Sequence, residues 1–156
     1  MLLAEALVLR ADRHKRLKEL ATRIENNARV PGGAAPDEDP EVLLEEATRV
    51  ADELVGLVRR INRTNAATVA GEDEGATVSD LIAERDRARD MAKLLRGAAQ
   101  AGTRGTGRGW GSREADATKA AVDVPALQRE ADRWAVRYRE LDVRLQQLNW
   151  ASELLE

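Results

Sequence analysis

The chain of 156 residues contains no cysteine, no phenylalanine, one tyrosine and one histidine. Without cysteine there are no disulfides, thiol nucleophiles, iron–sulfur clusters or cysteine-ligated zinc sites. One histidine cannot build a histidine-rich metal site, and the Glu-x-x-His ligand pair of carboxylate-bridged helical bundles is missing. We therefore expect neither a metal nor a cofactor.

Long hydrophobic runs are also missing. No stretch of about 18 apolar residues occurs, so the sequence predicts no transmembrane helix. The apolar start at residues 1–9 has no basic region before it and contains Glu5. These features indicate the first turns of a helix rather than an export signal, and the predicted location is cytoplasmic.

The charges are nearly balanced, with 25 basic and 28 acidic residues and a net charge of −3. This balance gives no general attraction to nucleic acids or anionic lipids. The glycine-rich stretch 101–122 lacks the Gly-x-x-x-x-Gly-Lys-Ser/Thr pattern of a phosphate-binding loop. Its arginines and glycines are typical of a flexible connector rather than an RNA-binding segment, and a short hairpin there stays open as an alternative.

Four segments carry apolar residues at alternating steps of three and four, the signature of a helix packed along a narrow seam. They predict helices at about 2–29, 40–65, 78–100 and 124–149 in a single domain, 1–156. The first predicted seam comprises Leu3, Leu7, Arg10, His14, Leu17, Ala21, Ile24 and Ala28. The other three comprise Leu43, Ala47, Val50, Leu54, Leu57, Ile61 and Thr64; Leu81, Arg85, Ala88, Ala92, Leu95 and Ala99; and Val124, Leu127, Ala131, Trp134, Tyr138, Leu141, Leu145 and Leu148.

The helix starts have recognisable caps. Asp39 precedes Pro40, Thr77 precedes Asp80 by three residues, and Asp123 opens the last helix. Each supplies a side-chain oxygen for the unpaired N–H groups of a first turn. Acid-first pairs four residues apart, such as Asp12 with Arg16 and Glu19 with Arg23, are expected on exposed helical faces.

The predicted fold class is all-α: an elongated antiparallel bundle of coiled-coil hairpins with four main helices. Helices of about 25 residues reach roughly 40 Å, more than the ~30 Å diameter of a compact globule of this length. Their Ala/Leu-rich seams are thin, so we expect copies of the chain to pair and complete the burial. The apolar tail at Leu154 and Leu155 either folds back on the bundle or docks on a neighbouring subunit.

Polar residues interrupt two of the seams. The predicted polar group comprises Arg10, His14, Asn62, Arg63, Asn65 and Arg85. One interpretation is a hydrogen-bonded layer that specifies register. The other is a pocket, formed where the first two helices meet, that binds a small ligand or carries out catalysis.

Several short motifs together resemble one family. They are Leu3-Ala4-Glu5-Ala6-Leu7, Leu9-Arg10-Ala11-Asp12, Ile61-Asn62-Arg63-Thr64-Asn65, Ala83-Glu84-Arg85-Asp86, Val122-Asp123-Val124, Tyr138-Arg139-Glu140-Leu141-Asp142 and Asn149-Trp150. Over nearly its whole length the chain resembles the septicolysin-like family of small bacterial helical proteins of unknown function. The resemblance implies a symmetric oligomer of more than two subunits and brings no catalytic residues.

Three functions follow as hypotheses. The first is a non-enzymatic, homo-oligomeric structural or interaction protein. The second is a small-ligand-binding or catalytic protein that uses the polar pocket. The third, suggested by the name of the family, is a membrane-active protein, although the sequence contains no membrane segment.

Overall fold

The computed structural model describes residues 1–32, 34–70, 75–103 and 119–156. These residues form the helices α1 (Leu3–Asn27), α2 (Pro40–Ala67), α3 (Val78–Thr103) and α4 (Val124–Ala151). The described ranges contain no strand, and the isolated bridges in them include the pair of Leu2 and Glu153. The predicted all-α fold with four main helices is therefore confirmed. The hairpin considered for the glycine-rich loop falls mostly on 104–118, outside the described residues.

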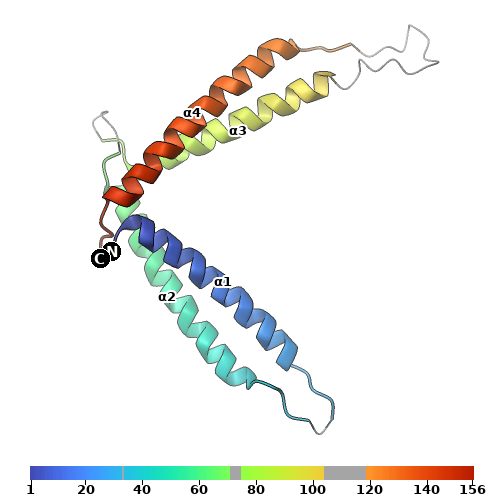
Figure 1. The fold of residues 1–156 in the computed structure, drawn as a ribbon, viewed down its shortest axis with the longest axis vertical. Coiled ribbons are helices and arrows are strands. Elements are labelled where there is room, and N and C mark those ends of the chain that lie inside the picture. Colours follow the sequence, from blue (N-terminus) through green and yellow to red (C-terminus); the bar gives the residue numbers. More distant parts are fainter. Residues whose placement is uncertain (33, 71–74, 104–118) are drawn as a thin grey trace, which may run out of the picture. The chain divides into compact units, whose positions relative to one another are not determined.

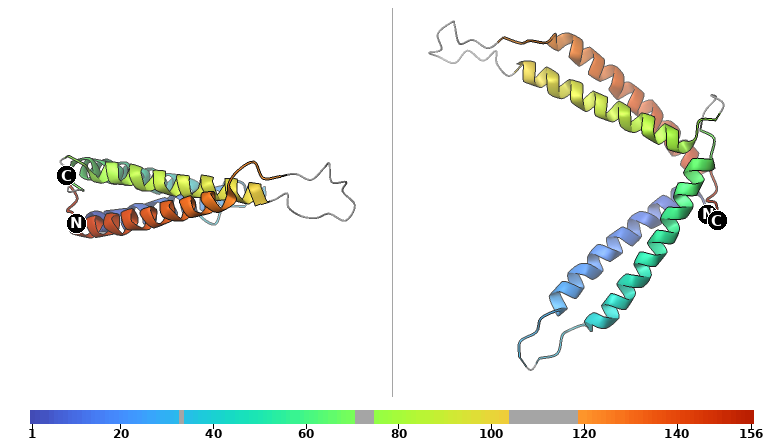
Figure 2. Two further views of the ribbon diagram at one scale, coloured as in Figure 1. Left: turned by 90° about the horizontal axis from the view of Figure 1, so that it is seen from above. Right: turned by 180° about the vertical axis from the view of Figure 1, so that it is seen from behind.

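The chain divides into two compact units. The first unit is Met1–Gly71 with Gln147–Glu156, and the second is Glu72–Gln146. In the first unit α1 and α2 lie antiparallel, and in the second α3 lies beside α4 (Figure 1; Figure 2). The single domain expected over 1–156 stays a prediction.

The predicted caps are confirmed at the starts of α2, α3 and α4. An Asp39 oxygen accepts from the N–H of Glu41 at 2.9 Å, and Pro40 occupies the first turn. The Asp80 carboxylate accepts from both the N–H and the hydroxyl of Thr77, at 2.8 and 2.6 Å. Asp123 accepts from the N–H of Ala126 at 2.9 Å. Each bond satisfies a donor that has no partner within the helix.

The seam of α1 differs in part from the prediction. The residues that are buried or half-buried at steps of three and four are Leu3, Ala6, Arg10, Arg13, Leu17, Leu20, Ile24 and Asn27. His14, Ala21 and Ala28, which the prediction placed on the seam, are exposed. Two adjacent stripes of α1 have the same period. One passes through Leu20 and the other passes through Ala21, the next residue. Burial favours the larger leucine, so the inner stripe passes through Leu20.

The seam of α2 is confirmed at every position from Leu43 to Thr64, each of which is buried or half-buried. Leu20 of α1 packs in a cluster with Leu43 and Val50 of α2. A second cluster joins Leu3 and Ala6 to Leu57 and Ile61. Their apolar contacts hold α1 against α2 along one line.

The seams of α3 and α4 are also confirmed. All six predicted positions of α3 and all eight of α4 are buried or half-buried. The buried positions of α3 include three alanines, and those of α4 include Leu141 and Leu145. Alanine facing leucine lets two helices approach closely, which is consistent with the near absence of aromatic residues.

The C-terminal segment belongs to the first unit. Leu154 is buried with Leu3, Ala6, Leu57 and Ile61, so this end of the chain folds back on the hairpin of α1 and α2. Its N–H donates to the carbonyl of Met1 at 2.9 Å. Of the two alternatives for the apolar tail, folding back is confirmed for Leu154, whereas Leu155 remains exposed.

Three ion pairs follow one side of the α1–α2 seam, which we name the ion-paired flank. Its arginines are Arg13, Arg16 and Arg23 of α1, and its acids are Glu53 and Glu46 of α2 and Glu38 just before α2, in that order. Nε of Arg13 lies 2.8 Å from Glu53, and Nη2 of Arg16 lies 2.6 Å from Glu46. The prediction that Arg16 and Arg23 pair with acids one turn earlier in their own helix was wrong. Arg16 pairs with Glu46 of α2 and also lies 3.6 Å from Glu19, one turn later in α1, whereas Arg23 pairs with Glu38.

The seam register of α1 can be tested by truncating one leucine. Leu20 is fully buried, so Leu20→Ala should lower the free energy of unfolding by about 2–5 kcal/mol. Leu94→Ala, at an exposed position of α3, should change it by less than about 0.5 kcal/mol. Urea unfolding followed by circular dichroism measures both variants. Equal effects would contradict the observed register.

The pair of Arg23 and Glu38 should make stability depend on pH. Hydrogen bonding to Arg23 lowers the pKa of Glu38 below its ordinary value. The ionised carboxylate therefore stabilises the fold above about pH 4.3, and this contribution is lost as the pH falls through the lowered pKa. Between pH 7 and pH 3, Glu38→Gln should lose less stability than the unmodified chain, and Asp12→Asn should lose as much as that chain. An unchanged pH profile for Glu38→Gln would show that the pair does not contribute in solution.

Candidate functional site

The two sides of the α1–α2 seam differ in chemistry. Apart from Arg13, which lies on the seam itself, the helical residues of the ion-paired flank are at positions just before seam residues, such as Arg16 before Leu17 and Glu46 before Ala47. The positions just after seam residues lie on the other side, which we name the open flank. Its residues are Leu7, Ala11, His14, Lys18, Ala21 and Glu25 of α1 and Leu44, Thr48, Ala51, Val55, Val58, Asn62 and Asn65 of α2. Its α2 half begins with apolar side chains and ends with two amides.

A shallow concavity of about 510 Å³ lies on the open flank. Its lining residues are Arg10, Ala11, His14, Lys15, Lys18 and Val58. Three of these side chains are arginine or lysine, one is the imidazole of His14, and none is acidic. Among the described residues, no hydrogen bond or ion pair engages the side chains of Arg10, His14 or Lys18. This arrangement favours a negatively charged group at the surface of the concavity.

The structure brings together two of the residues predicted to form a polar pocket. Arg10 and His14, one helical turn apart on α1, both line the concavity. Asn62 and Asn65 lie farther along the open flank and do not line it, and Arg63 is exposed outside the flank. Lys15, Lys18 and Val58 were missed. Of these three, Lys18 has a signal in the sequence, because Arg10, His14 and Lys18 follow one another in steps of four.

The motif Ile61-Asn62-Arg63-Thr64-Asn65 has a structural centre that was also missed. Thr64 is the one buried polar residue among those described, and its hydroxyl donates to the carbonyl of Arg60 at 2.8 Å. The same oxygen accepts from the N–H of Leu155 at 3.0 Å. The Arg60 guanidinium reaches the carbonyl of Leu155 and the carboxylate of Glu156. The motif therefore fixes the C-terminal segment against α2.

Arg85 belongs to the second unit and has acidic partners there. Its guanidinium donates to the adjacent Asp86 at 2.8 and 3.1 Å and lies 3.7 Å from Asp142 of α4. Arg85 therefore links α3 to α4 across their seam. These contacts give it a structural role within its own unit.

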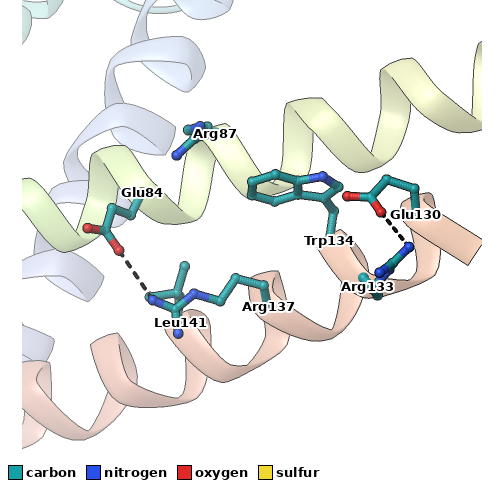
Figure 3. A pocket seen from close by; sticks show the side chains of 7 residues that line it. All are labelled: Glu84, Arg87, Glu130, Arg133, Trp134, Arg137 and Leu141. Carbon is teal, nitrogen blue, oxygen red and sulfur yellow. Dashed lines mark hydrogen bonds and ion pairs between the residues drawn. The ribbon is translucent and has the colours of Figure 1, made fainter.

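A second concavity, of about 490 Å³, lies between α3 and α4 (Figure 3). Its centre is Trp134, with the Arg87 guanidinium carbon 5.1 Å from the ring centroid, a cation–π contact. Glu130 lies 2.7 Å from Arg133, and Glu84 lies 3.5 Å from Arg137. Both carboxylates are thus paired with arginines, so the charges of this concavity largely neutralise each other.

A third concavity, of about 560 Å³, lies on the other side of the α3–α4 seam. Arg89, Lys93 and Arg96 surround the ring of Tyr138 there. Nε of Arg89 lies 3.0 Å from Asp90, and hydrogen bonding to that carboxylate raises the pKa of Arg89. Arg96 lies 3.9 Å from Asp132. Like the basic concavity of the first unit, this concavity has no acid in its lining, but two of its three cations have acidic partners nearby.

Two further classes of site are absent from the part of the chain that the structure describes. No group of three or more histidine and acidic side chains there is placed to hold a metal ion. None of the described helices combines the length and the apolar composition needed to cross a membrane.

Comparisons with known proteins place the chain in a family. No curated protein matches it. A solved structure described as a functionally unknown conserved protein from Corynebacterium diphtheriae is similar, with 35% sequence identity, a TM-score of 0.92 and coverage of 99% of each chain. Neither this protein nor the matching family model supports the septicolysin-like resemblance. That model is described as a family of unknown function, DUF6847, and matches residues 10–154, so the chain belongs to this family.

Proposed function

We propose that the protein is a homo-oligomeric structural or interaction protein rather than an enzyme. The observation that carries this proposal is the open flank, where apolar side chains recur on both α1 and α2 without a covering helix in their unit. Leu44 and Val55 of this flank expose 52% and 49% of their surface. Single exposed apolar residues are ordinary, but a repeat along two adjacent helices indicates an interface.

The arrangement of the polar residues supports the same function. Arginines and acids engage one another on the ion-paired flank and across the α3–α4 seam. The Thr77 hydroxyl donates to the Asp80 carboxylate at 2.6 Å, and this pair caps the start of α3. Three properties stay predictions of the sequence: oligomerisation, the presence of more than two subunits and a cytoplasmic location.

A second candidate function is the binding of a small anionic ligand, and the basic concavity favours it. Arg10, His14, Lys15 and Lys18 present donors toward one hollow without an acid in its lining. Phosphate and carboxylate groups are the ligands that such a set of cations binds best. This candidate is the more specific form of the ligand pocket predicted from the sequence.

The mass of the particle in solution tests the first candidate. We expect sedimentation equilibrium at micromolar concentration to give a multiple of the 17.1 kDa chain mass, with dissociation on dilution. The physical reason is that assembly covers apolar surface that a single copy exposes. A particle of 17.1 kDa at all concentrations up to the millimolar range would refute the proposal.

Thermal unfolding with added anions tests the second candidate. Inorganic phosphate, pyrophosphate and citrate are the probes, with matched chloride controls at equal ionic strength. A ligand at 100 times its dissociation constant should stabilise the chain by about 2.7 kcal/mol, and Arg10→Gln should remove the shift. Ser79→Ala, far along the chain in α3, should keep it. No shift with any probe would contradict ligand binding at this concavity.

A further inference from the structure

We propose that the open flank of the first unit binds the open flank of a second copy of this chain, with α1 of each copy lying over α2 of the other. This inference rests on the proposed homo-oligomeric function and names its interface. It assigns the basic concavity to the partner copy instead of a small ligand. Three properties of the flank support this pairing: its repeat, its size and the signs of its charges.

A pattern of positions repeats along both helices of the open flank. On α2 the sequence Leu44, Ala51, Val58 follows the seam residues Leu43, Val50 and Leu57 by one position each. On α1 the residues Leu7, His14 and Ala21 follow Ala6, Arg13 and Leu20 in the same way. Both helices thus carry a second stripe with the period of the first. A stripe of this period packs against another helix of the same period, and no helix of the first unit occupies that position.

The size of the flank matches an interface between two proteins. α1 has 25 residues and is about 37 Å long. Two helices side by side are about 20 Å wide, so the flank offers roughly 700 Å² in each copy. A stable interface of standard size buries about 800 Å² in each partner. The flank is thus somewhat below the mean size, but within the range, of one partner's share of a stable interface.

Level with Lys15 and Lys18 the edges of the flank carry opposite charges, and farther along Glu25 follows on the α1 edge and Arg59 on the α2 edge. Lys15 and Lys18 lie at the α1 edge, and Glu45 and Asp52 lie at the α2 edge. All four side chains are exposed, and among the described residues Lys18, Glu45 and Asp52 have no ion-pair partner. A partner that presents its acidic edge to the lysines and its basic edge to the acids would complement both.

A second copy meets this requirement in one of two symmetric arrangements. The pairs Arg13–Glu53 and Arg16–Glu46 set α1 and α2 in register, so Lys15 and Lys18 lie level with the α2 segment that contains Glu45 and Asp52. If the twofold axis runs parallel to the helices of the hairpin, α1 lies over the partner's α2 at the same height along the helices. The lysines of one copy then face the acids of the other. A twofold axis across the hairpin places α1 over the second copy's α1, and lysines face lysines. The charges select the first arrangement.

The same interface accounts for polar residues at its end. Asn62 and Asn65 continue the second stripe of α2 where its apolar residues stop. Amides at such positions favour one register over others, because a shifted register leaves them without partners. Asn62 and Asn65 thus favour one register between the two copies.

One pair of variants tests the surface. Val55→Glu places a charge on the open flank, and Val42→Glu places the same charge on the opposite side of α2, in line with Glu46. Their positions are similarly exposed, at 49% and 59%. Val55→Glu should weaken self-association by about 100-fold or more, whereas Val42→Glu should change it by less than about twofold. Sedimentation equilibrium measures association, and circular dichroism confirms that both variants are folded.

Charge reversal tests the arrangement. Lys18→Glu and Asp52→Lys should each weaken self-association, because each homodimer then sets like charges against each other twice. A mixture of the two variants should restore pairing, since both contacts of the heterodimer again join opposite charges. Mixing unmodified chain with Lys18→Glu should not give this rescue. An affinity-tagged copy of one variant measures capture of the other.

The outcomes separate this inference from the function on which it rests. An unmodified chain that remains monomeric overturns both. If the chain forms an oligomer and Val55→Glu leaves it intact, the open flank is not the interface, but the proposed homo-oligomeric function stands. Stronger association of Lys18→Glu would show that the two α1 helices face each other, which overturns the arrangement. A chain that stays monomeric but is stabilised by phosphate, with loss of that shift in Lys18→Glu, assigns the concavity to a small anion instead.

Discussion

Two helices packed along a single seam can cover only one stripe of each other's surface, and this constraint governs the first unit of the protein. Leu20, Leu43 and Val50 occupy the covered stripe and are almost fully buried. Leu44 and Val55 stand beside it on a second stripe and remain about half exposed. Arginines and acids close one side of the seam, which leaves the other as the natural place for a further helix.

The ends of the chain add a second constraint to the same unit. Leu154 joins the apolar cluster of Leu3 and Ile61, and Thr64 accepts a hydrogen bond from the N–H of Leu155. The Thr64 hydroxyl is buried, but it donates one hydrogen bond and accepts another, so it leaves no unpaired polar group in the core. The polar motif near the end of α2 is therefore explained by its contact with the C-terminal segment. Chemistry with a substrate is not needed to explain it.

Most arginines of the two seams already have acidic partners, whereas the cations around His14 have few. Arg85 is bound by Asp86 and Asp142, and Arg16 is bound by Glu46. Such pairs fix helix register and keep charged side chains from binding elsewhere. The unpartnered cations of the open flank are thus the ones available to another molecule. For this family of unknown function, interaction through a helical surface is the function that these contacts support best.

Sequence periodicity predicted the four helices, their caps and three of the four seams, because spacing and capping are local properties. It placed His14 on the seam of α1, since Leu7 and Ala21 have the same period as Ala6 and Leu20. Only the packed structure separated these two stripes, because the partner helix and the ion pairs with Glu46 and Glu53 set the rotation of α1. The partner of Thr64 was likewise decided in three dimensions, because Leu155 lies 91 residues away along the chain.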